Sequence, residues 1–401
     1  MTRRRLTILG ATGSVGTSTL DLVSAESDRF EIDTLTANRD VEGLARLAIT
    51  HKALHAVVAD EACYDALKVA LSGHDITVAA GRAALCEAAT RPVDMVVAAI
   101  VGVAGLAPAL AAARTQPMVA LANKESLVCA GSLFMRDVGE NATVLVPVDS
   151  EHSALLQALG GPAIGGAPDL THVSKLVITA SGGPFRTLSA GELARVTPQQ
   201  ALAHPVWSMG SKISIDSASL MNKALELIEA KYLFGIDSAR LDVLVHPQSI
   251  IHGLVHYRDG SVVAQMANPD MKVPIALALA WPQRMDAQVD PLDLAALGSL
   301  TFEQPDRRRF PALGLARQLL EADGGCSAVV NGANELAVDR FLAGAIGFTD
   351  IVAICEATLD SMAGGPLGDP QSLDDAMALD AEARRKAGEL AARPARSMFA
   401  G

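Results

Sequence analysis

Charged residues are scarce in this chain of 401 residues, and positive charge is scarcer than negative. Only 19% of the residues are charged while half are hydrophobic, a balance that excludes an intrinsically disordered protein. The 33 Lys and Arg stand against 45 Asp and Glu, which gives a net charge of −12. Because nucleic acids and anionic membranes attract basic surfaces, we expect neither as a partner. The length allows two or three folded domains.

Cysteine is rare as well. The five cysteines are odd in number and scattered, without a Cys-x-x-Cys pair, at Cys63, Cys86, Cys129, Cys326 and Cys355. This pattern excludes a disulfide framework and a zinc site, and it favours a reducing compartment. We interpret the cysteines as small buried residues and expect a cytoplasmic protein.

Long hydrophobic runs are almost absent. The only candidate for a membrane span, residues 95–113, contains two glycines and a proline, so we interpret it as a buried strand followed by an alanine-rich helix. The basic N-terminus precedes an apolar run, Leu6–Leu9, that is too short for a signal peptide.

Short β-branched runs alternate with helical stretches in the first third of the chain. This alternation predicts a Rossmann-like, doubly wound parallel sheet in an N-terminal α/β domain over residues 1–150. The expected strands are Leu6–Leu9, Glu31–Thr36, Ala56–Ala59, Ile76–Ala79, Met95–Ile100, Met118–Leu121 and Thr143–Val146.

The pattern changes near residue 150. Residues 151–290 are expected to form a central α+β catalytic domain, because a helical run, Ser217–Leu233, is followed by strands joined through short turns. Its largely antiparallel sheet would contain Lys175–Thr179, Asp242–Val245, Ile250–Tyr257 and Ser261–Gln265. After a linker at 291–311, residues 312–401 predict a small C-terminal helical domain with helices at Leu315–Ala322, Ala328–Ala343, Phe348–Met362 and Leu373–Leu390.

Three glycines, Gly10, Gly13 and Gly16, follow the first expected strand and open the first helix. Glycines at such a turn let a pyrophosphate approach the N–H groups at the start of a helix. At the first turn of an alternating pattern this motif indicates dinucleotide binding. A turn that needs glycine only for packing is the alternative.

The end of the second strand distinguishes between the two nicotinamide dinucleotides. NAD sites place an acid there, whereas NADP sites supply a cation for the 2′-phosphate. Here Asn38 offers a neutral donor and Arg39 a cation, which favours NADP. Asp40 weakens the argument, because it could pair with Arg39 and cap the next helix.

Asp149, Ser150, Glu151 and His152 follow the seventh expected strand. In an extended chain the carboxylates of Asp149 and Glu151 would point the same way, and a divalent metal would relieve their repulsion. Alternatively, these residues form the acidic first turn of a helix. The residues alone leave both interpretations open.

The helical run that follows Ser217 separates an apolar stripe from a polar face, and Asn222, Lys223 and Glu226 share that polar face. With Ser217 and Ser219 expected at the start of the helix, the face could hold a phosphate monoester. Glu226 could then complete a metal site with Asp149 and Glu151. On spacing alone, a solvated surface is the stronger interpretation.

Two further segments suggest contacts with a ligand. Thr179–Arg186 is a strand that runs into a Ser-Gly-Gly turn, whose N–H groups suit an anion. His204–Lys212 contains Trp207 and Met209 in a loop flanked by proline and glycine. Such a loop suits a lid, although anchoring by a buried tryptophan explains it equally well.

In combination, these strings resemble the 1-deoxy-D-xylulose 5-phosphate reductoisomerase family over essentially the whole chain. The matching strings are LGATGSVG (Leu9–Gly16), LANKESLV (Leu121–Val128), PVDSEH (Pro147–His152), SGGPFR (Ser181–Arg186), HPVWSMGSKISIDSASLMNKALELIEA (His204–Ala230), HPQSIIH (His246–His252) and NGANELAV (Asn331–Val338).

The resemblance implies roles for individual residues. Mg²⁺, Mn²⁺ or Co²⁺ would be bound by Asp149, Glu151 and Glu226, while NADPH would contact Thr12, Gly13, Ser14, Val15, Asn38, Arg39, Asp40, Asn123, Glu125 and Gly210. The substrate phosphate would be held by Ser181, Ser217, Asn222 and Lys223, with His204 closing over it. Lys124, Ser150 and Glu151 would contact the rest of the substrate, and Trp207 and Met209 would belong to a flap. Relatives often carry Gly and Lys in place of Asn38 and Arg39; the cation is kept, so a preference for NADPH is expected here as well.

The resemblance also implies that the protein is an enzyme. The family rearranges the carbon skeleton of 1-deoxy-D-xylulose 5-phosphate and reduces the resulting aldehyde to 2-C-methyl-D-erythritol 4-phosphate, a step of the non-mevalonate (MEP) isoprenoid pathway. The catalytic residues would be Lys124, Asp149, Glu151, His204 and Glu226, and a homodimer is expected. The alternatives are an NADP-dependent enzyme of the semialdehyde dehydrogenase type, which needs a nucleophilic cysteine, and a non-catalytic NADP sensor.

Overall fold

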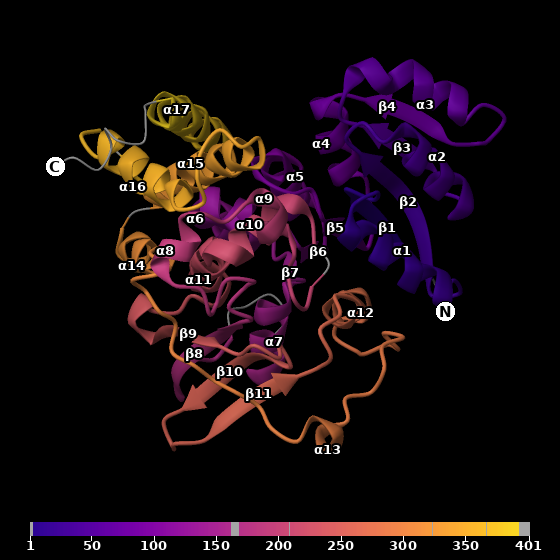
Figure 1. Cartoon of the computed structure of the whole chain (residues 1–401). Coiled ribbons are helices and arrows are strands. Elements are labelled where there is room, and N and C mark those ends of the chain that lie inside the picture. Colours follow the sequence, from indigo (N-terminus) through magenta and orange to yellow (C-terminus); the bar gives the residue numbers. More distant parts are fainter. Residues whose placement is uncertain (1–2, 162–167, 208, 323, 366, 393–401) are drawn as a thin grey trace.

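A seven-stranded parallel sheet forms the N-terminal part of the computed structural model, which describes residues 3–161, 168–207, 209–322, 324–365 and 367–392 (Figure 1). The strand order is β4-β3-β2-β1-β5-β6-β7, and every neighbouring pair is parallel. All seven strands predicted from the sequence are confirmed: β1 (Arg4–Leu9), β2 (Phe30–Ala37), β3 (His55–Val58), β4 (Thr77–Ala80), β5 (Met95–Ala98), β6 (Met118–Leu121) and β7 (Val144–Pro147). Because the order reverses between β1 and β5, a crevice for ligands is expected beyond their carboxyl ends.

Helices connect the parallel strands, as the alternating pattern predicts. They are α1 (Ser14–Ala25), α2 (Val41–Thr50), α3 (Tyr64–Ala70), α4 (Arg82–Thr90), α5 (Leu106–Thr115) and α6 (Glu125–Glu140), with short 3₁₀ turns η1 (Glu61–Cys63) and η2 (Val103–Gly105). Residues 95–113 form the buried strand β5 and most of α5, as expected. Among the described helices, none has both the length and the hydrophobicity that crossing a bilayer requires.

A second sheet of four strands lies below the first in Figure 1. Its order is β11-β10-β8-β9, with β8 (Val173–Ala180), β9 (Leu241–Val245), β10 (Ile251–Tyr257) and β11 (Val262–Met266). β10 pairs antiparallel with both neighbours, whereas β8 and β9 are parallel, so the expected sheet is confirmed as largely antiparallel. Helix α7 (Ser150–Ala158) packs on β10 and follows β7 directly, which joins the two sheets.

The helix predicted over Ser217–Leu233 is wrong as a single element. Helix α10 (Ser211–Ser219) ends at Leu220, which adopts a left-handed conformation with φ of 60°, and α11 (Met221–Phe234) then begins. The Ser219 hydroxyl donates to the Ile215 carbonyl at 3.0 Å and accepts from the Met221 N–H at 3.4 Å. A serine that bonds to its own backbone competes with helix continuation. Ser217 and Ser219 therefore lie at the end of α10 rather than at the start of the helix that carries Lys223.

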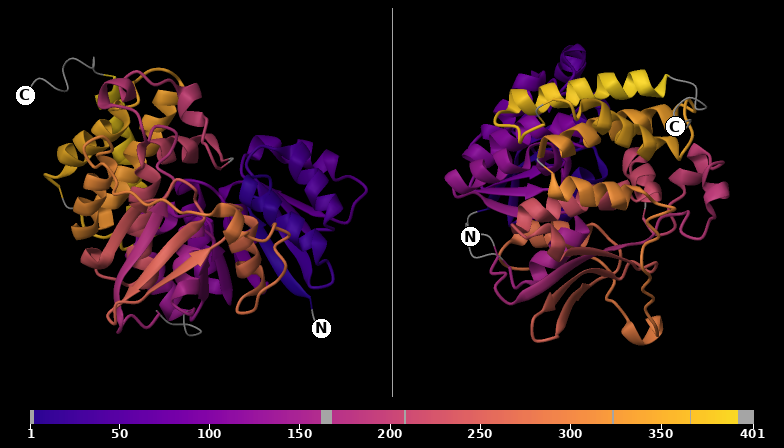
Figure 2. Two further views of the ribbon diagram at one scale, coloured as in Figure 1. Left: turned by 60° about the horizontal axis from the view of Figure 1, so that its bottom comes forward. Right: turned by 90° about the vertical axis from the view of Figure 1, so that its left-hand side faces the viewer.

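The last quarter of the chain is helical, as expected. Its helices are α14 (Ala312–Glu321), α15 (Gly324–Leu342), α16 (Asp350–Met362) and α17 (Leu373–Ala391). α14 packs against α11, α15 and α17 pack against α6, and α16 packs against α15 and α17; Figure 2 shows α17 lying along one side of this group. The segment expected as a linker contains α13 (Leu294–Leu297) and pairs Glu303 with Val245 at the edge of the second sheet. The remaining elements are α8 (Ala190–Leu193), α9 (Pro198–Leu202), α12 (Lys272–Ala280) and η3 (Ser238–Arg240).

Gly16 allows α1 to pack closely against the turn that precedes it. A Cβ at Gly16 would lie 2.4 Å from the Gly10 carbonyl oxygen, whereas a Cβ at Gly139 in α6 has nothing within 4 Å. We therefore expect Gly16→Ala to destabilise the N-terminal part by about 1–3 kcal/mol, as overpacking does. Gly139→Ala, which adds a better helix former in open space, is expected to be neutral or stabilising. Thermal unfolding of both variants checks this, and equal midpoints would contradict the steric explanation.

Candidate active site

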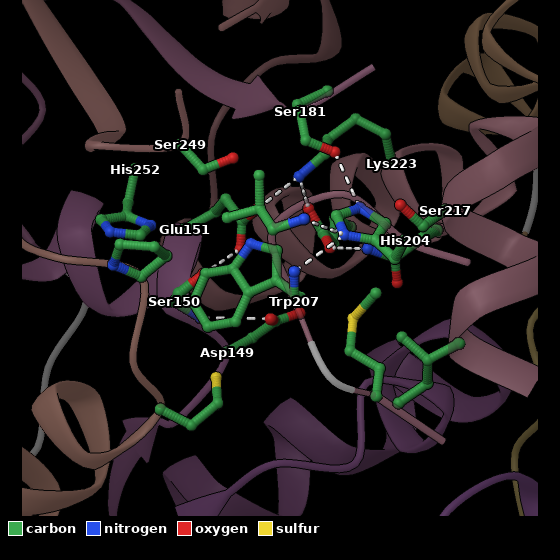
Figure 3. A pocket seen from close by; sticks show the side chains of 18 of the residues that line it. Asp149, Ser150, Glu151, Ser181, His204, Trp207, Ser217, Lys223, Ser249 and His252 are labelled. Atoms are coloured by element: carbon green, nitrogen blue, oxygen red, sulfur yellow. Dashed lines mark hydrogen bonds and ion pairs between the residues drawn. The ribbon is translucent and has the colours of Figure 1, made fainter. Parts of the chain in front are cut away.

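One cavity of about 330 Å³ lies where the first sheet, α7, α10 and α11 meet. Many of the residues singled out from the sequence line it: Ser14, Val15, Lys124, Asp149, Ser150, Glu151, Ser181, His204, Trp207, Met209, Gly210, Ser217, Asn222, Lys223 and Glu226. Figure 3 shows several of them pointing toward a common space. Thr12, Gly13, Asn38, Arg39, Asp40, Asn123 and Glu125 are not among its lining residues.

Three carboxylates converge at the floor of this cavity. Asp149 is the N-cap of α7, where it accepts from the Ser150 N–H at 3.1 Å, and Glu151 lies in the first helical turn. The expectation of an extended chain is wrong here, because the helix begins directly after β7. Oxygen atoms of Asp149, Glu151 and Glu226 nevertheless lie within 4.8 Å of one another. Asp149 and Glu151 therefore belong both to the acidic first turn of a helix and to a cluster of carboxylates.

Two buried lysines neutralise these carboxylates. The ammonium of Lys124 lies 2.5 Å from Asp149 Oδ2 and 3.0 Å from Glu226 Oε1. Lys223 Nζ lies 2.6 Å from Glu151 Oε1 and also pairs with Glu226. The face that carries Lys223 and Glu226 is thus buried, which contradicts the interpretation of a solvated surface helix.

The same surroundings shift the pKa values of two of these acids, Glu151 and Glu226, in opposite directions. Burial opposes ionisation of Glu151, but the Lys223 ammonium outweighs burial and lowers the pKa of this carboxyl to about 2. Burial and the neighbouring Glu151 charge raise the pKa of Glu226 to about 7. Of the acids in the cluster, Glu226 has the least stable charged form. An additional cation would therefore stabilise its carboxylate the most.

The carboxylate cluster fits a hard divalent cation. Carboxylate oxygens are the ligands that Mg²⁺ prefers, and ligands on opposite sides of Mg²⁺ are about 4.2 Å apart at bond lengths of 2.0–2.1 Å. The separation of up to 4.8 Å between the oxygens of Asp149, Glu151 and Glu226 requires only a small contraction. Asp149 Oδ2 is paired with the Lys124 ammonium at 2.5 Å, so a cation bound by the three carboxylates would share this oxygen with Lys124.

Sequence reasoning missed a second layer of buried polar residues beneath the carboxylates. Glu229 lies one turn beyond Glu226 and is fully buried, 3.3 Å from His152 Nδ1, while the other imidazole nitrogen lies 2.9 Å from the Glu226 carbonyl oxygen. Burial and the Asp149 charge raise the pKa of Glu229, and burial lowers the pKa of His152 to about 4. The spacing of three between Glu226 and Glu229 was the available signal, since it places both on one helix face.

The other end of the cavity suits a phosphate. Ser181 accepts from the Gly183 N–H at 3.1 Å, and its hydroxyl lies 3.0 Å from His204 Nε2. Because His204 Nδ1 accepts N–H bonds from Val206 and Trp207, its proton is on Nε2 and points at Ser181. Ser217 lines the same space, and the Ser217 carbonyl would lie 2.8 Å from a Cβ at Gly183. The Ser-Gly-Gly turn therefore packs directly on the end of α10.

The loop between α9 and α10 covers the cavity. Trp207 lies edge-on to His252 with 6.1 Å between ring centroids, and both residues line the cavity together with Met209 (Figure 3). Trp207 is half-buried rather than packed in a core. Its position favours a flap over the interpretation of an anchor; Ser208 lies outside the described residues. His252 and Ser249 are lining residues without a role assigned from the sequence.

The glycine turn opens α1 at the edge of the cavity. Gly10 has φ of 85°, and a Cβ there would lie 2.8 Å from the Ala99 carbonyl oxygen. Gly13 is the N-cap and provides no capping side chain, so the first N–H groups of α1 are open to an anion. Thr12 belongs to the same turn, and Ser14 and Val15 continue from it into the cavity wall.

The residues expected around a 2′-phosphate follow β2 on the surface. Asp40 caps α2 by accepting from the Gly43 N–H at 2.9 Å, so the capping alternative is confirmed. Arg39 pairs instead with Asp60, with Nε 2.6 Å from Oδ2, and its side chain is 76% exposed. Only the Nε edge of the guanidinium is engaged by that pair. Asn38 is exposed beside it.

Asn123 and Glu125 are buried next to the cavity rather than lining it. The Asn123 amide donates to the Gly102 carbonyl at 3.0 Å and to the Ile100 carbonyl at 2.5 Å. Glu125 pairs with Lys212 at 2.8 Å. Both residues therefore hold the loop after β5 and the start of α10 in place.

Comparisons with known proteins agree along the whole chain. Family models described as 1-deoxy-D-xylulose 5-phosphate reductoisomerase match residues 6–131, and those of its C-terminal domains match residues 145–234 and 266–386. The 1-deoxy-D-xylulose 5-phosphate reductoisomerase of Afipia carboxidovorans is 53% identical over 96% of this chain and 94% of that protein. The enzyme of the same name from Rhodospirillum centenum is 52% identical over 97% of this chain and 94% of its own length.

Solved structures show the same fold. The reductoisomerase from Zymomonas mobilis in complex with NADPH has a TM-score of 0.90 and 49% identity, covering 98% of this chain and all of that one. A reductoisomerase in complex with NADPH, fosmidomycin and magnesium has a TM-score of 0.91 and 40% identity, covering 97% and 98% of the two chains. On sequence, fold and site alike, the chain belongs to the 1-deoxy-D-xylulose 5-phosphate reductoisomerase family.

Proposed function

We propose that this protein converts 1-deoxy-D-xylulose 5-phosphate to 2-C-methyl-D-erythritol 4-phosphate, using NADPH and a divalent metal, in the non-mevalonate (MEP) isoprenoid pathway. One observation carries the proposal. A cluster of three carboxylates paired with two lysines lies in the same cavity as the N-terminus of α1, which the glycine turn leaves open. Substrate, metal and dinucleotide would therefore meet in one enclosed space.

The phosphate of the substrate would be held away from the reacting carbons. Ser181 and Ser217 offer hydroxyls, Asn222 an amide and Lys223 a cation, while His204 presents its Nε2–H from the flap. Binding energy from a remote phosphate is available to position the substrate and to close the flap. A flap that covers the cavity also excludes water during the reaction.

The reacting end of the substrate would lie over the carboxylates. Asp149, Glu151 and Glu226 would hold the metal, which when bound supplies polarisation of the carbonyl, and NADPH supplies the hydride. Lys124, already paired with two of these acids, would place a second positive charge beside the hydroxyl and keto oxygens. Ser150 donates to Glu151 at 2.6 Å and would orient that carboxylate. The skeleton rearrangement would proceed by retro-aldol cleavage and re-addition or by a ketol shift.

The semialdehyde dehydrogenase alternative lacks its nucleophile. Among the described residues, none of those lining the cavity is a cysteine. Cys129 and Cys355 are buried, and burial raises the pKa of both thiols, whereas a nucleophilic cysteine needs a lowered pKa. The scattered cysteines support a cytoplasmic location as part of this proposal.

The test of this function is consumption of NADPH, followed at 340 nm, with 1-deoxy-D-xylulose 5-phosphate as substrate. After chelation we expect no turnover, because the carboxylates then lack their cation, and restoring Mg²⁺ or Mn²⁺ should restore it. Bound NADPH without turnover under any metal would contradict the proposal and favour the sensor alternative.

A matched pair of variants serves as the control. Glu226→Gln removes a carboxylate from the cluster and is expected to lower kcat by about 10²-fold or more, while the affinity for NADPH stays nearly unchanged. Glu321→Gln changes an exposed residue at the end of α14 and should leave both unchanged. Equal activity of the two variants would remove Glu226 from the mechanism.

Arg39 is expected to select NADPH over NADH. A charge-assisted contact with a phosphate contributes about 1.5–3 kcal/mol. Arg39→Ala should therefore raise KM for NADPH about tenfold or more and change KM for NADH little. Arg46→Ala, on the exposed face of α2, is the control. Parallel changes for both dinucleotides would contradict the assignment.

The homodimer is proposed with β11 as its contact. β11 is an edge strand of the second sheet, and Val262 and Val263 are 47% and 43% exposed on it. An exposed, apolar edge strand is a template for pairing with another chain. We expect light scattering to give twice the mass of the chain, and Val263→Lys to shift the protein toward monomer. Val69→Lys, on a side chain that is 75% exposed in α3, should not, and a monomeric parent would contradict the proposal.

A further inference from the structure

Lys212 fixes the point at which the flap joins the rest of the protein. It lies in the first turn of α10, directly after the flap, whose described residues are 204–207, 209 and 210. Its ammonium is 2.8 Å from Glu125 Oε1 and 2.8 Å from Asp216 Oδ2, and the side chains of these acids are 5% and 1% exposed. Because buried charges are costly to leave without a partner, the first turn of α10 is held where Lys212 meets both acids.

Glu125 connects this point to the glycine turn. Its second oxygen accepts from the Asn123 amide at 3.3 Å, and the same amide donates to the Gly102 carbonyl at 3.0 Å. The loop that contains Gly102 begins after Ala99, and the Ala99 carbonyl lies close to Gly10. A continuous set of contacts therefore leads from the first glycine of the turn to the start of α10.

Helix α15 braces both ends of this set, although it contributes no residue to the cavity lining. The buried amide of Asn334 donates to Asp216 Oδ1 at 2.9 Å. The next residue, Glu335, accepts from the Val103 N–H at 3.2 Å and pairs with Arg384 of α17. The motif NGANELAV therefore has a structural role, because Asn334 and Glu335 hold α10 and the loop after β5 at a fixed separation.

We propose that Lys212 is a positioning residue that couples occupancy of the dinucleotide turn to placement of the flap, with Asn334 as its brace. The inference rests on the proposed function, because it takes the glycine turn as the NADPH site. NADPH bound against the loop after β5 stabilises the arrangement in which Glu125 and Lys212 are paired, and the flap then lies over the cavity. Such coupling is reciprocal, so placement of the flap also favours NADPH.

Trp207 provides a direct readout of flap placement. Trp207 and Trp281 are the only tryptophans in the sequence, so a Trp281→Phe parent leaves the flap residue as the sole emitter. In this parent we expect NADPH to change the Trp207 emission. In Lys212→Met, NADPH should still bind by calorimetry, but the change in emission should be lost, and KM for the sugar phosphate should rise about tenfold, within the usual range of coupling factors.

Three further variants separate positioning from general stability. Lys212→Arg keeps the cation and should restore most of the response. Asn334→Leu removes the brace but not the ion pair, so the response should be reduced rather than lost. Lys175→Met removes a cation from an ion pair with Asp242 in the second sheet and should leave the response unchanged.

Two results with the Lys212→Met variant would overturn the inference. One is a full Trp207 response in Lys212→Met. The other is loss of NADPH binding in that variant together with a lowered thermal midpoint and no rescue by arginine, which would make Lys212 merely structural. Failure of the proposed function is distinguishable, because a parent that shows the response without turning over substrate refutes the activity alone. A parent that turns over substrate without any response refutes the coupling alone.

Discussion

The site depends on neutralising carboxylates that are brought together with little exposure to water. Asp149, Glu151 and Glu226 repel one another in this interior, and without cations they would either separate or take up protons. Lys124 and Lys223 come from different parts of the chain, one before α6 and the other in α11. Their ion pairs therefore hold α11 against the carboxyl ends of β6 and β7 while they partly neutralise the acids and keep them in reach of a metal.

This charge cluster also explains why the cavity lies where it does. The first sheet reverses its order between β1 and β5, and the glycine turn and Ala99 face each other at that point. Strand β7 ends at the same edge and delivers Asp149 directly onto the N-terminus of α7, whose dipole favours a carboxylate. The ends of β1 and β7 and the starts of α1 and α7 thus place the dinucleotide site and the metal site side by side.

Much of this arrangement could be predicted from the sequence, for physical reasons that differ between elements. Parallel strands are buried on both faces, so β1 to β7 appear as short apolar runs that composition alone reveals. The break at Leu220 could not be predicted, because neither glycine nor proline marks it and its cause is a serine hydroxyl bonded to its own helix. His152 belongs to the motif PVDSEH, but its contact with Glu229 depends on how two helices pack. Asn334 and Asp216 lie too far apart in the sequence for any local pattern to connect them.

Helix α10 imposes a constraint on length rather than on residue identity. Within it, Lys212 with its ion pairs lies five residues before Ser217, about 7.5 Å at 1.5 Å per residue, and Ser217 packs against the Ser-Gly-Gly turn. Inserting one residue between them would rotate Ser217 by about 100° relative to Lys212 and withdraw its hydroxyl from the cavity. Insertions and deletions among relatives should therefore be absent from this helix even where its surface residues vary freely.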